Sequence, residues 1–258
     1  MSMSNRKSNP IRTGEQCCLE QGYVQCGANW YRCYGQGLLH VVTFRGPPER
    51  KSSRKQTTSL EIYSLYDWIM WVDLPIMGAR RDVIPGISPS VLVCESVMSP
   101  EEDVAHNAEV MIDHGFSFLN KIDTHAKLAD FCEYLDGKTP GGGRKNDNKK
   151  IIPYLLSGQS EKATAVIDAI EQQNRQAHET NCRMMLKSYD PEIQLNKMFA
   201  RLRPYLSLRD SILARDASCA VEILQINYQK NVDYLSAMGI CVPDNHLTNR
   251  ELVQLMQL

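Results

Sequence analysis

The residues with the clearest chemical potential are a cysteine and a histidine in the stretch NWYRCYGQGLLHVVTFRG, Cys33 and His40. A thiol beside an imidazole can lose its proton and attack an electrophilic carbon. Because glycines flank Gln36, we expect 35–37 to form a hairpin turn that brings the two side chains near one another. The sequence places no acid to orient the histidine and no donors for an oxyanion, so a buried structural pair is the alternative interpretation.

A group of basic side chains around the same hairpin could bind an anionic partner. Arg32 lies on the first expected strand, and the segment RGPPERKSSRKQ after the second strand has the composition of an exposed loop. The basic residues of this loop are Arg45, Arg50, Lys51, Arg54 and Lys55. With the aromatic residues of the hairpin, they indicate a surface that binds nucleic acid by stacking and phosphate contacts. The alternative is a solvated loop beside aromatic side chains that pack across the sheet.

The overall charge argues against a large nucleic-acid surface. The chain has 29 basic and 30 acidic residues and a net charge of -1, so it has no long-range field to attract an anionic polymer. Alternation along the first strand also places Trp30 and Tyr34 on one face and Tyr31 on the other. Nucleic-acid binding therefore remains the alternative to protein binding.

The histidines of the middle of the chain do not have the spacing of a metal site. His106 and His114 are eight residues apart, which is more than two helical turns and too far to bind one ion. His125 and the acids Asp103, Glu109 and Asp113 are also nearby, but pairs that share a helix face, such as Glu109 with Asp113, usually lie on solvated helix surfaces. The glycine run KTPGGGRK follows an expected helix and lacks the strand and GK[ST] ending of a phosphate-binding loop. We expect neither a metal site nor a cofactor site.

Cysteine usage and hydropathy indicate a compartment. The nine cysteines are scattered without a C-x-x-C pair or zinc-ligand spacing, which is typical of reduced thiols in a reducing compartment. The most apolar segment, WIMWVDLPIM, is short and is interrupted by Asp73 and Pro75, so it does not predict a membrane span. The beginning MSMSNRKSNP has no apolar stretch typical of a secretory signal. We expect a cytoplasmic protein with no membrane partner.

Strand-forming segments dominate the first third of the chain. A short helix is expected over 12–21, and the hairpin arms over 29–34 and 38–44 follow it. The second arm is apolar on both faces, which predicts an inner strand. Further strands are expected in 57–67 and 90–96, and strands in succession favour an antiparallel sheet of about four strands.

Apolar residues recur at helical spacing from Ser99 onward. A Ser-Pro start and three acids in the first turn predict a helix that ends at Gly115, and a second helix ends at Gly137. Further helices are expected over 151–158, 159–181, 190–206, 207–239 and 247–258. The break near 206 is placed by Pro204. The sequence therefore predicts an α+β protein with its sheet in the N-terminal part, packed by helices, and an all-helical C-terminal part.

One segment has the composition of a linker. Residues 137–150, GKTPGGGRKNDNKK, are rich in glycine and lysine. They predict a sheet-containing domain over 1–136 and a helical C-terminal region over 151–258, which could be a separate domain or could pack on the first.

The N-terminal third resembles a bacterial family of small α+β domains of unknown function. The residues that carry the resemblance are CLEQGY, NWYRCYGQGLLHVVTFRG and TTSLEIYSLYD, over about residues 15–95. The family has a helix, a GY entry, a WYR strand and a strand that ends in VV.F. Many members have Gln after that phenylalanine, where this chain has Arg45. The resemblance implies an immunity-like or partner-binding role in a bacterial toxin system.

These observations leave three functional hypotheses. The leading one is a non-enzymatic bacterial protein that binds another protein, in an immunity or accessory role. The first alternative is a nucleic-acid-associated protein that uses the basic 45–55 loop. The second alternative is a cysteine-dependent enzyme that uses Cys33 and His40.

Overall fold

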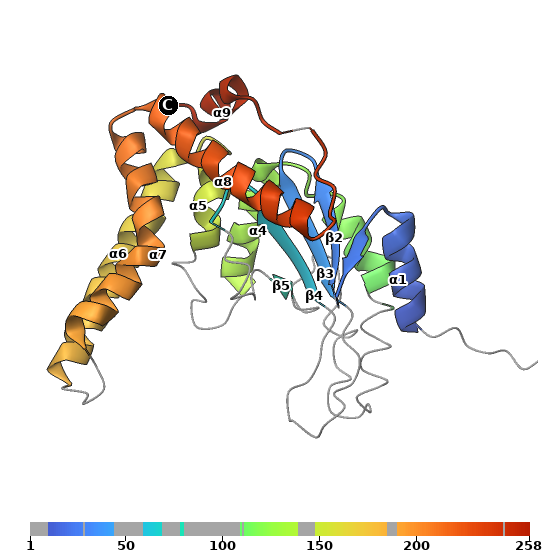
Figure 1. Cartoon of the computed structure of the whole chain (residues 1–258), viewed down its shortest axis with the longest axis horizontal. Helices are drawn as coiled ribbons and strands as arrows, with labels where there is room; N and C mark the ends of the chain where they lie inside the picture. Colours follow the sequence, from blue (N-terminus) through green and yellow to red (C-terminus); the bar gives the residue numbers. More distant parts are fainter. Residues whose placement is uncertain are drawn as a thin grey trace, which may run out of the picture. The chain divides into compact units, whose positions relative to one another are not determined.

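The computed structural model describes most of the chain and divides it into two compact units (Figure 1). The described residues are 10–27, 29–43, 59–68, 78–79, 109, 111–138, 148–184, 190–244 and 246–258. Unit 1 is made of Met1–Tyr63, Trp71–Asp123 and Asp233–Asp244. Unit 2 is made of Ser64–Met70, Thr124–Val232 and Asn245–Leu258. Both flanks of the segment 137–150 belong to unit 2, so the division differs from the boundary that the sequence suggests.

A β-sheet in the N-terminal part followed by helices confirms the predicted α+β class. The sheet has the order β1-β2-β3-β4-β5. Its strands are β1 (Val24–Cys26), β2 (Asn29–Tyr34), β3 (Leu38–Thr43), β4 (Ser59–Ser64) and β5 (Gly78–Ala79). β3 lies between β2 and β4 and all six of its residues are buried, which confirms the inner strand expected from its two apolar faces. The strand expected over 90–96 lies outside the described residues.

The β2–β3 hairpin has the expected three-residue turn. Gly35 and Gly37 have φ values of 54° and 75°, a left-handed backbone that residues with a side chain rarely adopt. Gly35 is required for a second reason, because a Cβ there would collide with the backbone carbonyl oxygen of Asp123. The turn therefore fixes the hairpin against the segment that follows α3 (Phe116–Leu119).

The helices of unit 1 differ from the prediction at one end. α1 (Pro10–Glu20) matches the expected first helix. Gly115, however, is not a helix end, because a π-helical turn η3 (Met111–Gly115) leads directly into α3. Gly115 has helical angles, and Phe116 and Leu119 are buried, so the helical backbone continues where its side chains enter the core.

The helices of the second half of the chain follow the predicted succession. They are α4 (His125–Lys138), η4 (Asn148–Lys150), α5 (Ile151–Leu155), α6 (Ser160–Arg183), α7 (Pro191–Leu213), α8 (Ala217–Ala237) and α9 (Asn249–Met256). α6 and α7 run side by side as a long helical hairpin (Figure 1).

The expected helix end near Pro204 is wrong. α7 passes through Pro204 and ends at Leu213, and the break falls instead at 214–216, where Arg215 has a φ of 54°. A proline inside a helix removes one hydrogen bond and costs about 3 kcal/mol. Buried Tyr205 and Leu208 follow Pro204 directly, and burial of such side chains offsets that cost.

A short segment, 64–67, is held inside unit 2 by asparagines of α8. Asn231 Nδ2 donates hydrogen bonds to the carbonyl oxygens of Leu65 (2.7 Å) and Asp67 (2.9 Å), and Asn227 Nδ2 donates to Tyr66 (3.3 Å). Both asparagines are buried. They supply donors to a backbone that leaves the sheet at this point, which is the role that buried amides commonly have.

Candidate functional site

Cys33 and His40 do not form a catalytic pair. The register joins Arg32 to His40 and Cys33 to Leu39, so Cys33 and His40 point to opposite faces of the hairpin. Burial, with a smaller contribution from Cys241, raises the pKa of Cys33 to about 12, and burial lowers the pKa of His40 to about 4. Both shifts disfavour an imidazolium–thiolate pair at neutral pH.

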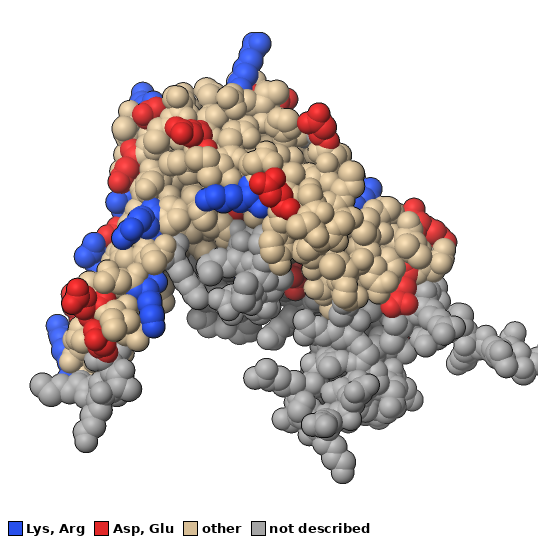
Figure 2. Space-filling model, viewed as in Figure 1, with Lys and Arg blue, Asp and Glu red and all other residues tan. Residues whose placement is uncertain are grey.

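The aromatic side chains of the hairpin belong to the core. Trp30 and Tyr31 are 3% and 4% exposed, on opposite faces, so they offer no stacking platform for bases. The loop residues Arg45, Arg50, Lys51, Arg54 and Lys55 lie outside the described residues. On the helical hairpin of α6 and α7, basic and acidic side chains alternate (Figure 2). An even mixture of this kind produces little net field.

The histidines considered for a metal site are not brought together. His106 lies outside the described residues, His114 is exposed, and His125 is fully buried, where its Nε2 lies 2.9 Å from Ser64 Oγ. Within the described ranges, no group of three or more His, Cys, Asp or Glu side chains is placed to hold a metal ion. The eight cysteines in those ranges are free thiols.

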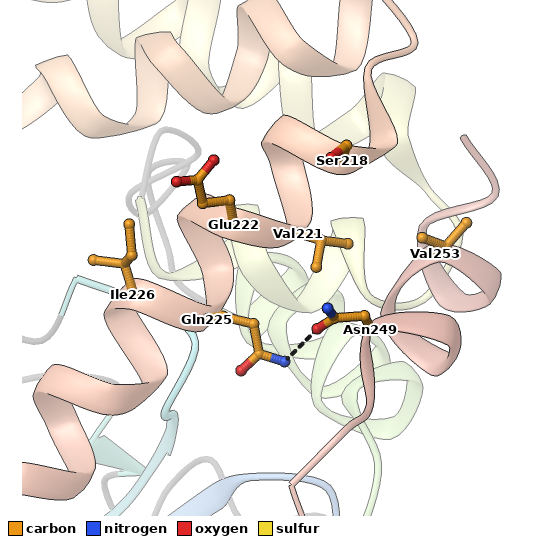
Figure 3. Close-up of a pocket in the computed structure, with 7 residues that line it drawn as sticks. All are labelled: Ser218, Val221, Glu222, Gln225, Ile226, Asn249 and Val253. Atoms are coloured by element: carbon orange, nitrogen blue, oxygen red, sulfur yellow. Dashed lines mark hydrogen bonds between the residues drawn. The ribbon is translucent and has the colours of Figure 1, made fainter.

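An open groove of about 410 Å³ lies between α8 and α9 in unit 2 (Figure 3). Its lining residues, which we call the α8–α9 groove, are Ser218, Val221, Glu222, Gln225, Ile226, Asn249 and Val253. Three are aliphatic, and Ile226 has 46% of its surface exposed. A large exposed aliphatic side chain at the edge of a groove is typical of an interaction surface.

The spacing of residues along the two helices creates the groove. Val221 and Gln225 are one turn apart on α8, and Asn249 and Val253 are one turn apart on α9, so each pair lies on one face of its helix. The adjoining face of α9 carries Leu252 and Met256, which are fully buried. These two side chains hold α9 to the body of unit 2, and Asn249 and Val253 border the groove beside them.

Hydrogen bonds fix the wall that α9 contributes. Gln225 Nε2 donates to the carbonyl oxygen of Leu247 (3.1 Å) and to Asn249 Oδ1 (3.3 Å). The backbone N–H of Leu247 donates to the Tyr66 hydroxyl at 2.7 Å. Thr248 and Glu251 form a reciprocal capping box at the start of α9. The groove is therefore rigid before any partner arrives.

The polar rim of the groove has unused hydrogen-bonding and charge capacity. Glu222 is exposed, and within the described part of the chain its carboxylate makes no ion pair or hydrogen bond. Ser218 is exposed one turn before it on α8. The rim is thus negatively charged beside an aliphatic floor.

The sequence reasoning missed the groove because its two walls are separated in the chain. The spacing of Val221 and Gln225 is visible in the sequence, but the interaction of Gln225 with 247–249 depends on how the chain folds back. The one available signal was the cap at Thr248, with Glu251 three residues later.

Comparisons of the chain with protein families, with curated proteins and with solved structures gave no match. None of the helices in the described ranges combines the length and the apolar composition that a membrane crossing requires.

Proposed function

We propose that this chain is a non-enzymatic, cytoplasmic bacterial protein that binds another protein, and that the α8–α9 groove is its binding surface. The observation that supports the proposal is the half-exposed Ile226 on the edge of a rigid groove. Preformed walls reduce the entropic cost of binding, because few side chains must be ordered when the partner arrives. The resemblance of the N-terminal third suggests an immunity or accessory role for this binding.

The chemistry of the groove selects the occupant. The aliphatic lining, with Val221 and Val253 inside and Ile226 at the edge, favours an apolar side chain. The unpaired carboxylate of Glu222 lies on the rim and favours a cation. The occupant is therefore a short segment of another protein in which an apolar side chain stands next to Lys or Arg.

Two exposed isoleucines allow a matched test. Ile226 is 46% exposed in the groove, and Ile193 is 50% exposed on α7 and does not line it. A photoreactive residue at each position, introduced separately into the full chain in bacterial cells, reports which surface contacts a protein. We expect a discrete crosslinked protein from position 226 and none of the same mass from position 193.

Binding of the purified crosslinked partner then decides between the surfaces. Calorimetry should show that Ile226→Glu weakens binding at least about tenfold, since a carboxylate replaces a desolvated apolar contact. Glu222→Lys should weaken binding and reverse its salt dependence. Ile193→Glu should leave the affinity unchanged. Equal affinities for Ile226→Glu and Ile193→Glu would exclude the groove as the binding surface.

A further inference from the structure

A second candidate site lies in unit 1, around an arginine, Arg32, that no carboxylate of the described residues neutralises. Arg32 is on β2, is partly exposed, and has no ion pair among the described residues. Placing a charged group in a partly buried position without a counter-charge is costly, so such arginines are normally paired. Arg32 therefore requires an explanation beyond sheet packing.

Two tyrosine rings hold the guanidinium group of Arg32. Its Cζ lies 4.7 Å from the ring centroid of Tyr34 and 5.7 Å from that of Tyr23. Both distances are within the range of cation–π attraction. An aromatic ring over a guanidinium restricts its plane, and a hydrogen-bond acceptor then approaches along the free edge of the guanidinium.

Asn120 anchors the guanidinium from one edge. Arg32 Nη1 donates to Asn120 Oδ1 at 3.1 Å, while Asn120 Nδ2 donates to Gln21 Oε1 at 3.1 Å. The Tyr34 hydroxyl donates to the Asn120 carbonyl oxygen at 3.4 Å. The side-chain amide of Asn120 is thus fixed by Arg32 and Gln21, and its main-chain carbonyl by Tyr34, so Asn120 orients the guanidinium.

Most donors of Arg32 remain unused. A guanidinium has five N–H donors, and Arg32 uses one on Asn120 and one on the buried Tyr23 hydroxyl. His40 is opposite Arg32 in the register, and its ring contacts the backbone of Ile122. Burial raises the pKa of Tyr23 and lowers that of His40 to about 4, so both are neutral at pH 7 and leave the positive charge of Arg32 in place.

We propose that Arg32, held by Tyr23 and Tyr34 and anchored by Asn120, binds a carboxylate group of a ligand. A carboxylate is planar and accepts two parallel hydrogen bonds from one guanidinium edge. It carries one negative charge and matches the single charge of the cluster, whereas a phosphate dianion needs more donors and more positive charge. This proposal does not depend on the α8–α9 groove.

The carboxylate has two sources that one experiment separates. The full chain, labelled with nitrogen-15, is titrated at constant ionic strength with acetate, with the peptide acetyl-Ala-Ala-Ala bearing a free C-terminus, and with the same peptide as its amide. The readout is the Nε–H signal of Arg32 in the NMR spectrum, which is assigned by its loss in Arg32→Lys. Sodium chloride and inorganic phosphate serve as reference anions.

We expect a saturable shift of the Arg32 signal with a dissociation constant on the order of 1 mM for a carboxylate. If acetate and the free-acid peptide both saturate the signal, the ligand is a small organic acid. If only the free-acid peptide saturates it, the ligand is a protein C-terminus. Arg32→Lys keeps the positive charge but loses the two parallel N–H donors of the guanidinium, so it should bind a carboxylate at least about tenfold more weakly. Because this variant lacks the Arg32 signal, its binding is followed by the Asn120 Nδ2 signal.

Two controls keep the result interpretable. Asn120→Ala leaves Arg32 in place and should weaken binding several-fold, because the guanidinium loses its anchor. Arg203→Lys, at an exposed position on α7, should bind as the wild type does. A wild-type signal that carboxylates move no more than chloride, or that inorganic phosphate saturates more tightly than acetate, would overturn the proposal. A lower melting temperature of Arg32→Lys without any ligand shift in the wild type would assign Arg32 a purely structural role.

Discussion

Two buried histidines predict that mild acid destabilises this protein. His40, in unit 1, and His125, in unit 2, are both 0% exposed. Burial lowers the pKa of His40 from 6.5 to about 4 and that of His125 from 6.5 to about 3. Among the described residues Ser64 and Tyr66 face His125. A hydrogen bond to the Ile122 backbone partly favours the proton on His40, and Arg32 disfavours it, but burial outweighs both. Both side chains are therefore neutral in the folded protein.

The sign and the size of the effect follow from linkage between protonation and folding. The folded-state pKa values lie below the unfolded value, so the unfolded chain binds more protons as the pH falls below about 6.5, and stability is lost from there downward. At pH 5 an unfolded histidine is mostly protonated and a buried one mostly neutral, which corresponds to about 2 kcal/mol for each histidine. A loss of this size is large beside the 5–15 kcal/mol stability typical of a domain.

Denaturant unfolding at pH 7 and pH 5 measures this loss. We expect the free energy of unfolding to fall by about 2 kcal/mol for the unit that contains each histidine. Glu171 interferes little in this window, since hydrogen bonds from Arg175 and Arg209 lower its pKa below the usual range. Circular dichroism and tryptophan fluorescence should both report the change.

A matched pair of variants identifies the residue responsible. His125→Gln keeps a polar group near Ser64 and cannot be protonated, so the pH dependence of unit 2 should nearly disappear. His114→Gln, at an exposed position, should retain it. A loss below about 1 kcal/mol in the wild type, or the same loss in both variants, would refute the reasoning from buried neutral imidazoles.

Two substitutions test the packing that the fold depends on, with stability measured by denaturant unfolding. Gly35→Ala should lower stability by about 1 kcal/mol because of its positive φ, and by a further 1–3 kcal/mol because of the collision with Asp123. Gly27 also has a positive φ but has open space around it, so Gly27→Ala should show the first cost alone. Equal losses would exclude the close approach. Asn231→Ala should cost about 2–3 kcal/mol, because two buried carbonyl oxygens lose their donor, and exposed Asn196→Ala should cost less than about 0.5 kcal/mol. A small effect of Asn231→Ala would mean that the 64–67 segment is held by other contacts.

The succession of strands and helices was predictable because it depends on local periodicity. The glycines of the hairpin turn and the apolar second arm placed β2 and β3 correctly. Helix ends were less predictable, since they depend on contacts made elsewhere in the chain. Pro204 is a helix breaker in isolation, but α7 continues because the residues after it enter the core, and the break falls at Arg215 instead.

The candidate sites show the same limit. Arg32 could be selected from the sequence as a charge on a strand, but the residues that hold it, Tyr23 and Asn120, are identified only by folding. Strand register places Cys33 and His40 on opposite faces of the hairpin. The sequence already implied this, because Cys33 is two residues before the turn and His40 is three residues after it. Asn227 and Asn231, one turn apart on an otherwise apolar helix face, were the available signal for a buried hydrogen-bond network.

The division of the chain has a consequence for its synthesis on the ribosome. Unit 1 takes its last piece from 233–244, after nearly all of unit 2 has been made. Domains that are continuous in sequence can fold one after another as they emerge. Here the sheet of the first residues must wait for the end of α8 before its unit is complete, so β2 and β3 remain partly uncovered through most of translation. Exposed apolar strands of that kind are where chaperones act, and expression of N-terminal fragments alone should yield aggregated protein.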